Sequence, residues 1–432
     1  MHITLIKPSL GDSNQTFKLN DGSMEPMPLA ILAGLIKSPD QVIMWDDRLE
    51  AIPFDRQTDL VCITVDTFNA RRSYQISAEY RKRGVPVILG GMHVSILPEE
   101  ASKQADAIVL GDAEPVWDQL MSDVRKASLQ KIYQAPFGIP QENCNPDRSI
   151  FKGKNYLPIS LVQFSRGCHF NCSFCSVSRF FNKSYKCRPW EDVIREIEEN
   201  NLKTVLFVDD NMVSEKAELK TFLKELIPLK IKWASQTSIN MVNDRELLKL
   251  MADSGCIGNL IGFESININS LDWFNKAPNT RNFNQYAEAI EILRDYGFMT
   301  WASFIMGNDF DTQESMEKTV EFAIKNKFAL AYFHILMPYP GTKVYEQFKT
   351  ENRLLYDGEW WNHPDYRYNM ATFLPKNMSP EQLSEATIKA NKDFYGVSSI
   401  VNRMFEPNTN LKNLVNFLIY SKFNYILRTT ST

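Results

Sequence analysis

Short apolar runs alternate with longer amphipathic stretches along most of this chain. In the first 125 residues the apolar runs have the length and β-branched content of buried strands, and the stretches between them have helical periodicity. This alternation predicts an open parallel sheet, in which ligands sit at the carboxyl ends of the strands. The expected strands are Ile3–Ile6, Gln41–Trp45, Leu60–Val65, Val85–Leu89 and Ala107–Leu110, and the expected helices are Leu29–Ile36 and Ser73–Arg83.

The same alternation resumes after a segment that contains several prolines and little periodicity. Six further strands with helices between them predict a partial parallel (β/α)6 barrel, whose site lies at the mouths of the strands. The expected strands are Leu161–Phe164, Thr204–Val208, Lys232–Gln236, Asn259–Phe263, Thr300–Met306 and Ala331–Met337.

These patterns divide the chain into four parts. Residues 1–125 form a Rossmann-like α/β domain, 126–154 a linker, 155–345 the partial barrel, and 346–432 a small, mostly helical C-terminal region that sets substrate specificity. In the last part, Ser379 and Pro380 open a helix as N-cap and first residue. The apolar stretch Leu411–Leu427 predicts a helix that packs on the barrel or, less often, lies on a membrane surface or accepts a lipid.

Composition narrows the class of protein. The chain has 432 residues, 44% of them hydrophobic, and a net charge of −4, which gives no general argument for nucleic-acid binding. The seven cysteines are an odd number with three close together, so we expect a reducing cytoplasm rather than a disulfide scaffold. The N-terminal run lacks the features of a signal peptide, and no run approaches the ~20 apolar residues that span a bilayer.

The three close cysteines carry the strongest chemical signal. They follow the spacing Cys168-x-x-x-Cys172-x-x-Cys175. A four-iron cluster commonly takes four thiolates, so three leave one iron open to a substrate or cofactor. The alternatives are buried cysteines or a zinc site, which needs a fourth ligand such as His169 or, better placed, Cys187.

This motif, with the aromatic Phe174 before its third cysteine, resembles the signature of the radical S-adenosylmethionine (SAM) superfamily. The resemblance implies a [4Fe-4S] cluster on the three cysteines, with SAM on the open iron. It also implies reductive cleavage of SAM to a 5′-deoxyadenosyl radical that abstracts hydrogen from the substrate. An electron donor such as flavodoxin or ferredoxin would then be a partner.

Polar residues at the following strand ends extend the resemblance, which covers residues 155–345. Family members hold the amino group of SAM after the second strand, its carboxylate or ribose after the third, and place a Gly-x-Glu-Ser element beside it. The matching residues here are Asp209, Asp210, Asn211, Gln236, Ser238 and Glu264. The Asp-Asp-Asn segment replaces the frequent Gly-Gly-Glu, and a helix-capping aspartate pair is an equal alternative. A carboxylate that ends an apolar strand needs a partner, which favours Glu264 as a site residue.

Residues 1–118 resemble the cobalamin-binding domain that precedes the radical domain in one large subfamily. The resemblance implies cobalamin contacts at strand ends and just beyond them, from Thr64, Thr67, Gly90, Gly91, His93 and Gly111. Turn glycines and strand threonines are the alternatives. The Asp-x-His-x-x-Gly motif that ligates cobalt from below in mutases is missing, and His93 is expected near the nucleotide end. A degenerate domain that binds no cobalamin stays open.

Together the two resemblances imply a cobalamin-dependent methyltransferase that acts on an unactivated carbon. One SAM would supply the methyl group through cobalamin, and a second would supply the radical. Relatives of this type act on lipids, tetrapyrroles, peptides and natural-product precursors, and the sequence does not choose among these substrates. A radical SAM cyclase, oxidase or dehydratase without net methylation is the alternative, and an electron-transfer module is a third class.

Overall fold

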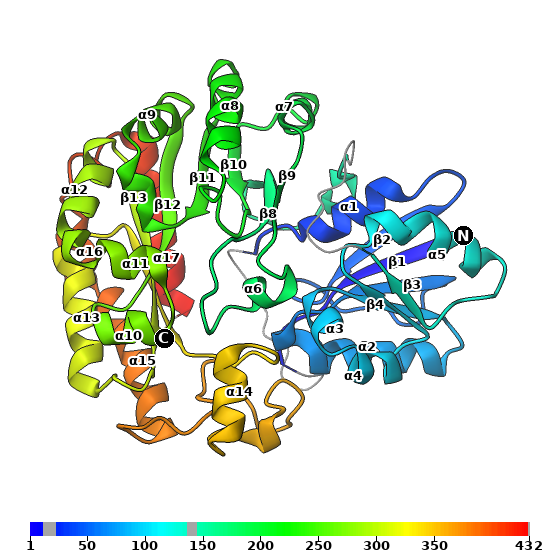
Figure 1. The fold of residues 1–432 in the computed structure, drawn as a ribbon. Coiled ribbons are helices and arrows are strands. Elements are labelled where there is room, and N and C mark those ends of the chain that lie inside the picture. The colour runs from blue at the N-terminus through cyan, green and yellow to red at the C-terminus, as the bar shows by residue number, and fades with distance from the viewer. Residues whose placement is uncertain (12–22, 136–144, 431–432) are drawn as a thin grey trace. The chain divides into compact units, whose positions relative to one another are not determined.

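The computed structural model describes residues 1–11, 23–135 and 145–430 (Figure 1). The chain forms two compact units. The first contains Met1–Leu161, Phe180–Asn182 and Tyr356–Tyr368, and the second contains Val162–Arg179, Lys183–Leu355 and Asn369–Thr432. The second unit therefore excludes a short piece of the region that follows the barrel, and the four-part division expected from the sequence stays a prediction.

A six-stranded parallel sheet forms the centre of the first unit. Its strand order is β2-β1-β3-β4-β5-β6. The strands are β1 (His2–Lys7), β2 (Gln41–Asp46), β3 (Leu60–Thr64), β4 (Val87–Gly90), β5 (Ala107–Leu110) and β6 (Ile132–Gln134). The main helices are α1 (Met27–Leu35), α2 (Ala70–Lys82), α3 (Met92–Ile96), α4 (Pro98–Lys103) and α5 (Trp117–Arg125).

Five of these strands and helices α1 and α2 confirm the pattern read from the sequence. Strand β6 was missed because three residues are too short to show an alternation, and it lies in the segment expected to be a linker. The prolines of that segment at positions 136 and 140 lie outside the described residues.

The second unit contains the partial barrel, with the strand order β14-β13-β12-β11-β10-β7. Neighbouring strands from β10 to β14 pair in parallel. The strands are β7 (Ser160–Val162), β10 (Thr204–Phe207), β11 (Lys232–Thr237), β12 (Cys256–Glu264), β13 (Met299–Met306) and β14 (Leu330–Ile335). The helices between them are α7 (Trp190–Glu199), α8 (Lys216–Leu226), α9 (Arg245–Asp253), α12 (Tyr286–Asp295) and α13 (Gln313–Lys325).

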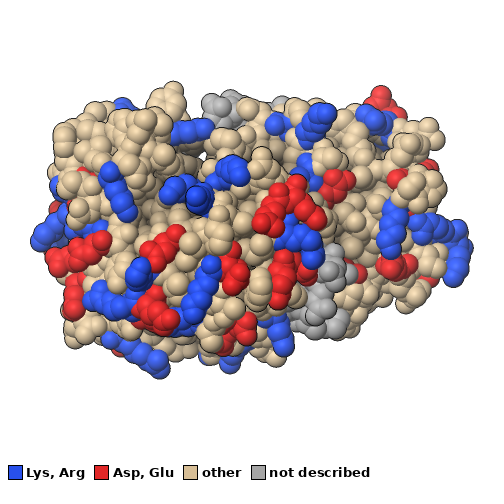
Figure 2. Space-filling model, turned by 90° about the horizontal axis from the view of Figure 1, so that it is seen from above, with Lys and Arg blue, Asp and Glu red and all other residues tan. Residues whose placement is uncertain are grey.

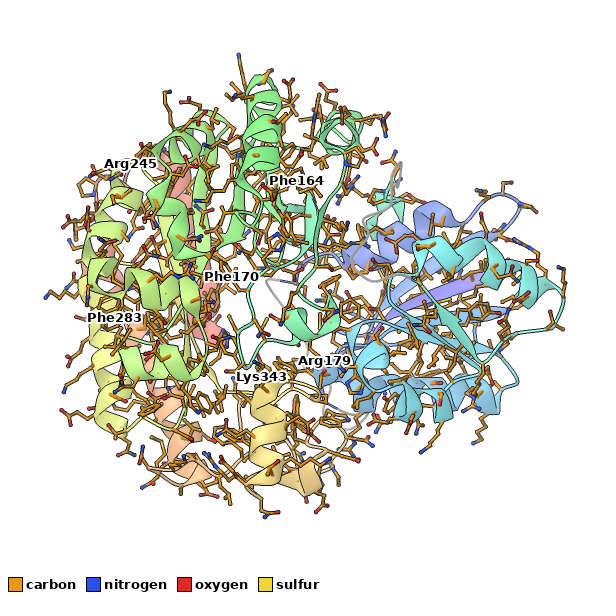
Figure 3. The ribbon with its side chains drawn as sticks, viewed as in Figure 1. Phe164, Phe170, Arg179, Arg245, Phe283 and Lys343 are labelled. Atoms are coloured by element: carbon orange, nitrogen blue, oxygen red, sulfur yellow. The ribbon has the colours of Figure 1, made fainter. Side chains whose placement is uncertain are left out.

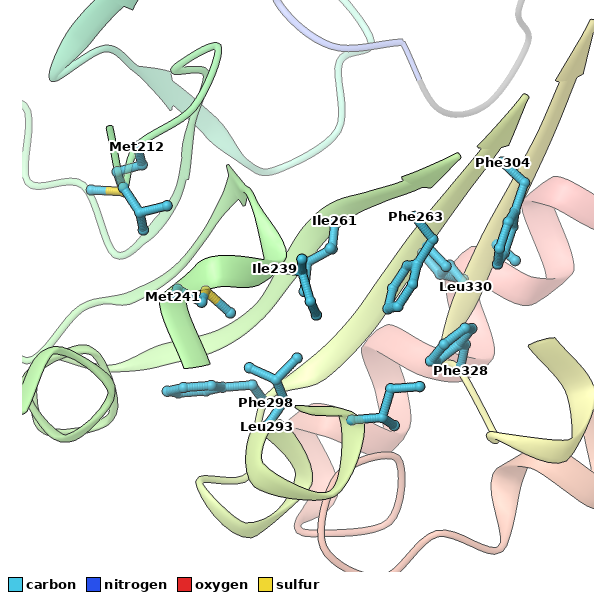
Figure 4. Close-up of a cluster of buried hydrophobic side chains, with 14 of the residues drawn as sticks. Met212, Ile239, Met241, Ile261, Phe263, Leu293, Phe298, Phe304, Phe328 and Leu330 are labelled. Atoms are coloured by element: carbon cyan, nitrogen blue, oxygen red, sulfur yellow. The ribbon is translucent and has the colours of Figure 1, made fainter. Parts of the chain in front are cut away.

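A continuous apolar core fills the space between this sheet and its helices (Figure 4). Alternate residues of the strands supply it, among them Ile261, Phe263 and Phe304, each fully buried. Phe304 stacks on Phe333 of the next strand with ring centroids 5.5 Å apart. Since the odd and even positions of a strand point to opposite faces, the other set of side chains lines the concave face of the sheet.

The chain between β7 and α7 forms a hairpin that the sequence did not indicate. Strand β8 (Ser165–Gly167) pairs antiparallel with β9 (Tyr185–Cys187), and the short helix α6 (Ser176–Phe180) lies between them. The expected single strand Leu161–Phe164 is thus divided into β7 and the approach to β8.

The C-terminal region is helical, as expected. Its helices are α14 (Lys343–Thr350), α15 (Pro380–Phe394), α16 (Val397–Met404) and α17 (Leu414–Thr430). Ser379 caps α15 through the Gln382 amide, which confirms the predicted helix start. Among the described residues no helix is both long and apolar enough to cross a membrane. Figure 2 shows both signs of charge interspersed over the face that it displays.

Candidate functional site

The three cysteines lie on the loop that connects β8 to α6, in the second unit. Cys172 is buried, and Cys168 and Cys175 are half-buried. The loop is anchored on the segment after β12: Ser173 donates its amide to the Phe274 carbonyl at 2.9 Å, and Asn275 donates its side-chain amide to the Asn171 carbonyl at 2.7 Å. Figure 3 labels Phe170, which lies between the first two cysteines.

The Asp-Asp-Asn segment after β10 holds the start of this loop. Asp209 is fully buried and accepts hydrogen bonds from the Phe164 amide, at 3.2 Å, and from the Ser165 hydroxyl. Asp210 accepts from the Gly167 amide at 2.8 Å, directly before the first cysteine. Neither aspartate caps a helix; both bind the strand that delivers the cysteines.

The third residue of the segment reaches a cysteine itself. Asn211 donates to the Cys168 sulfur at 3.7 Å and accepts from the Ser238 hydroxyl at 3.2 Å. The Ser238 hydroxyl is therefore part of the network that positions the loop. Gln236, two residues earlier at the end of β11, has an exposed side chain. The structure thus brings Asn211 and Ser238 together and leaves Gln236 accessible to a ligand.

Glu264 ends β12 in an unusual backbone conformation and has a partner that sequence reasoning missed. Its φ is +63°, and the pairing with β13 shifts register beside it. Its carboxylate pairs with the Lys276 ammonium at 2.7 Å. A Cβ on Gly262 would lie 2.2 Å from the Glu264 carboxylate, so a larger residue there would displace the carboxylate from its present position. No local pattern marks Lys276, which precedes α11 (Ala277–Asn282) and meets Glu264 only through the fold.

Burial and neighbouring charge set the protonation of this site. Burial raises the pKa of the Cys172 thiol to about 12 and also raises the pKa of Cys175. Burial opposes the charge on Lys276, but Glu264 and Cys172 outweigh it and raise the pKa of the ammonium group. A metal displaces such protons and takes thiolates, and the lysine then offsets their charge. The donor set therefore fits an iron–sulfur cluster.

The alternative zinc ligands gain nothing from the structure. Cys187 pairs in register with Ser165. That residue lies three positions before Cys168, roughly 10 Å back along an extended chain. Among the described residues, no three His, Cys, Asp or Glu side chains converge on a single metal ion. This finding concerns single ions, because the thiolates of a four-iron cluster bind separate irons.

Two aromatic residues line the concave face of β14 and were also missed from the sequence. Tyr332 and His334 are stacked with ring centroids 5.9 Å apart, and the residues between and beside them point into the core. The His334 side chain is exposed, yet burial of its ring lowers its pKa below the usual value. The alternation of β14 could have shown this face, had the strand boundaries been known.

In the first unit, the predicted cobalamin residues lie at the carboxyl ends of three neighbouring strands. Thr64 ends β3, Gly90 ends β4, and Gly111 follows β5. A Cβ on Gly90 would meet only the Val109 side chain, at 3.8 Å, so the strand end is open. Gly91 is different: its φ is +116° and an added Cβ would lie 2.6 Å from the Val65 carbonyl, so the fold itself requires this glycine.

Thr67 and His93 are closed inside a hydrogen-bond network. His93 is fully buried; its Nδ1 lies 3.3 Å from the Thr67 hydroxyl and its Nε2 lies 3.2 Å from the Glu100 carboxylate. Trp361 and Tyr74 donate to the same carboxylate, at 3.1 and 2.7 Å. Both ring nitrogens of His93 are thus engaged, and the residue cannot ligate cobalt. Trp361 packs as a core residue of this unit.

These strand ends fit a cobalamin site of the type that lacks a lower histidine ligand. The open glycine edge at Gly90 admits a bulky ligand, and the Thr64 side chain is half-exposed beside it. The Gly111 amide is already bonded to the Ser95 hydroxyl at 3.0 Å. Thr64 and Gly90 are therefore the residues best placed to contact a cofactor.

Comparison with known proteins agrees with the geometry. Residues 162–323 match the model of the radical SAM superfamily. The chain is 30% identical over 421 residues to bacteriochlorophyllide d C-12(1)-methyltransferase of Chlorobaculum tepidum, an alignment that covers 94% of this chain and 91% of the relative. It is 26% identical to the anaerobic magnesium-protoporphyrin IX monomethyl ester cyclase of Cereibacter sphaeroides, over 87% of this chain and 67% of that one.

Among solved structures, the fold resembles the radical SAM methyltransferase TsrM of Kitasatospora setae, which contains cobalamin and a [4Fe-4S] cluster. The TM-score is 0.64 at 16% identity, over 81% of this chain and 78% of that one. The cysteine loop on its partial barrel thus defines a radical SAM protein. More narrowly, the chain belongs to the family of radical SAM methyltransferases that includes the bacteriochlorophyllide enzyme.

Proposed function

We propose that this protein is a cobalamin-dependent radical SAM methyltransferase that adds a methyl group to an unactivated carbon. The cysteine loop is the observation on which the proposal rests. Asp210 and Asn211 hold the start of this loop by hydrogen bonds. The Lys276–Glu264 ion pair lies close enough to Cys172 to affect its charge. When bound, the cluster supplies the electron that cleaves SAM, and cobalamin carries the methyl group.

The side chains of the second unit have separate roles in this proposal. Cys168, Cys172 and Cys175 hold the cluster. Asp209 and Asp210 are positioning residues, because they fix the backbone that leads into the loop. Three other side chains are proposed to contact SAM. Gln236 offers an exposed amide, Glu264 a buried carboxylate beside a lysine, and Asn211 an amide at the end of a strand.

The first unit holds cobalamin at the ends of β3 and β4 in this proposal. Thr64 and Gly90 contact the cofactor, while Gly91, Thr67 and His93 keep the strand ends in shape. His93 would not serve as a cobalt ligand, since both of its ring nitrogens are engaged by protein side chains.

The substrate proposed first is a tetrapyrrole. The methyltransferase and the cyclase described above act on a bacteriochlorophyllide and a magnesium protoporphyrin. The stacked Tyr332 and His334 on the concave face supply the aromatic surface that a flat macrocycle needs. Flavodoxin or ferredoxin provides the electron, and the reaction takes place in the cytoplasm.

The test is anaerobic incubation of reconstituted protein with a reductant and SAM, with and without hydroxocobalamin. We expect 5′-deoxyadenosine from the radical step, and S-adenosylhomocysteine from the methyl-transfer step only when cobalamin is present. Protein that retains cobalamin but forms no S-adenosylhomocysteine would contradict the methyltransferase proposal.

A second candidate is a ring-forming or oxidising reaction without net methylation, which the similarity to the cyclase favours. The two functions differ in the mass of the product, because only methylation adds a methyl group. They also differ in the fate of SAM, because a cyclase forms 5′-deoxyadenosine without S-adenosylhomocysteine.

A further inference from the structure

Helices α16 and α17 bury several polar side chains against the protein and expose several apolar ones. An ordinary surface helix turns its apolar face to the core, whereas α17 has apolar side chains both on the side that packs on the core and on the side that faces solvent. On α17, Asn416, Tyr420 and Asn424 follow one another at intervals of four and are buried. Leu414 and Leu418, on the opposite side, are 70% and 55% exposed.

The buried polar side chains attach the helix by hydrogen bonds. Asn416 donates to the Thr409 carbonyl at 2.8 Å, Asn424 donates to the Ala329 carbonyl at 3.1 Å, and Tyr420 donates to the Ile400 carbonyl at 2.6 Å. Apolar side chains add to this attachment, since Tyr420 packs with Met299 and Ala329 of the barrel. The helix thus packs on the barrel, as the sequence indicated, and its outer side is not needed for that packing.

Helix α16 also buries a polar side chain and exposes apolar ones. Arg403 is fully buried, donating to the Phe328 and Ala329 carbonyls at 2.9 and 3.0 Å and to the Asn424 side chain at 2.9 Å. Val397 and Val401, one turn apart, are exposed. The exposed apolar residues of α17 share one side of the helix by their spacing and, with Leu411 just before them, form what we call the outer face: Leu414, Val415, Leu418 and Tyr425.

The charged side chains along α17 have one sign. Residues 407–432 contain Lys412, Lys422 and Arg428 and no aspartate or glutamate. All three residues are exposed, and none forms an ion pair with any residue that the structure describes. The Lys412 side chain lies over Gly297 of the barrel, so the cations beside the outer face are Lys422 and Arg428. The preceding carboxylate, Glu406, is buried and pairs with Arg294 at 3.1 Å.

We propose that the outer face binds the surface of an anionic lipid bilayer. An apolar helix face flanked by unpaired cations is the arrangement that lies in a membrane interface, with apolar side chains among the acyl chains and cations at the headgroups. A second copy of this chain fits less well, because a symmetric dimer through this face would bring the two sets of cations together. The proposal does not depend on the proposed function.

The test is flotation of the full-length protein with vesicles of phosphatidylcholine alone or with added phosphatidylglycerol. We expect binding to the vesicles that contain phosphatidylglycerol, weakened by high salt because headgroup attraction is screened. The double variant L414S/L418S should lose on the order of tenfold or more in affinity, since two apolar side chains no longer enter the bilayer. The double variant K422Q/R428Q should lose on the order of 30-fold.

The matched control is I388S, which changes an exposed apolar residue of α15 outside the outer face and should bind as the natural protein does. Circular dichroism and thermal unfolding check that the variants fold, and 5′-deoxyadenosine formation checks the radical site independently. Two results would overturn the proposal. One is equal binding by the natural protein and L414S/L418S, or no binding by either. The other is a lipid-free dimer in sedimentation that L414S/L418S abolishes.

Discussion

The carboxyl ends of the two parallel sheets carry the predicted site residues in different ways. In the second unit, Asp210, Asn211 and Ser238 extend toward the cysteine loop and hold it. In the first unit, Thr67 and His93 bond to each other and to Glu100. Trp361 completes that network, although it lies 261 positions further along the chain than Glu100.

Polar residues at a strand end therefore indicate how a site is built, and only some of them contact the ligand. The polar residues of the radical site support a loop that carries the ligands, so their effect on chemistry passes through the loop. The polar residues Thr67 and His93 of the first unit form hydrogen bonds within a closed network. The open edge at Thr64 and Gly90 is therefore the part that a cofactor could reach. The two edges should therefore respond separately to mutation.

The largest effect is expected at the cysteines. Cys172→Ala removes one of three thiolates, and we expect loss of the iron–sulfur absorption and of all 5′-deoxyadenosine formation. Cobalamin retained after desalting should not change. Cys187→Ala is the matched control and should keep both iron and SAM cleavage, because its register with Ser165 places it away from the loop. Equal loss of iron in both variants would make Cys187 a fourth ligand.

The next effect is expected at the buried ion pair. Lys276→Met leaves the buried Glu264 carboxyl group without its partner, which typically costs about 3–5 kcal/mol. Urea unfolding should show this loss, and SAM cleavage should fall with it. The double variant E264Q/K276M removes the charge on both sides and should recover part of the stability but not the SAM cleavage. Full recovery of cleavage would show that the pair is only structural.

A smaller effect is expected in the network of the first unit. Burial raises the pKa of Glu100, but hydrogen bonds from His93 and Tyr74 outweigh it and lower the pKa below its usual value. The stability that this carboxylate contributes is therefore present above its unfolded pKa, near 4.3, and is lost as the pH falls through the lower folded value.

Glu100→Gln should cost about 1–3 kcal/mol at pH 7, because the neutral amide accepts these hydrogen bonds less well. It should also flatten the dependence of thermal unfolding on acid, while SAM cleavage stays unchanged. Glu99→Gln is the control at an exposed neighbour. A loss of SAM cleavage in Glu100→Gln but not in Glu99→Gln would contradict the expectation that the two sheet edges respond separately to mutation.

The smallest effect on stability is expected at the open glycine. Gly90→Ala adds a methyl group where the nearest atom is 3.8 Å away, so the free energy of unfolding should change by less than about 0.5 kcal/mol. The same methyl group should weaken cobalamin binding, measured by absorption after desalting. Gly91→Ala is the contrast: it forces a side chain into a positive φ against Val65 and should destabilise the unit by about 1–3 kcal/mol.

Most of the fold could be predicted from the sequence, but only part of the site could. Strands that show a buried apolar run, such as Leu60–Thr64 and Ala107–Leu110, were predicted within a residue or two, because their pattern is local. The short strands β6 and β8 have no pattern of their own and form because neighbours offer them hydrogen bonds. The cysteine motif is local as well, so its three residues could be named in advance.

The partners of the site could not be named, because they are brought together only by tertiary structure. Lys276 follows Glu264 by twelve positions and has no motif around it. Trp361 reaches Glu100 from the C-terminal part of the chain. The way in which α17 is attached could not be predicted either. Its apolar residues indicated packing on the barrel, but buried asparagines provide part of the attachment by hydrogen bonds. Such pairings depend on which faces meet, and no local spacing records that.

The proposed transfer of a methyl group from SAM to the substrate is tested most directly by following that methyl group. The reconstituted protein is incubated with cobalamin, reductant, a bacteriochlorophyllide acceptor and SAM deuterated in its methyl group, and the product is measured by mass spectrometry. We expect a product that gains one deuterated methyl group, with 5′-deoxyadenosine and S-adenosylhomocysteine formed in equal amounts. A product that is oxidised or cyclised and carries no deuterated methyl group would contradict this expectation.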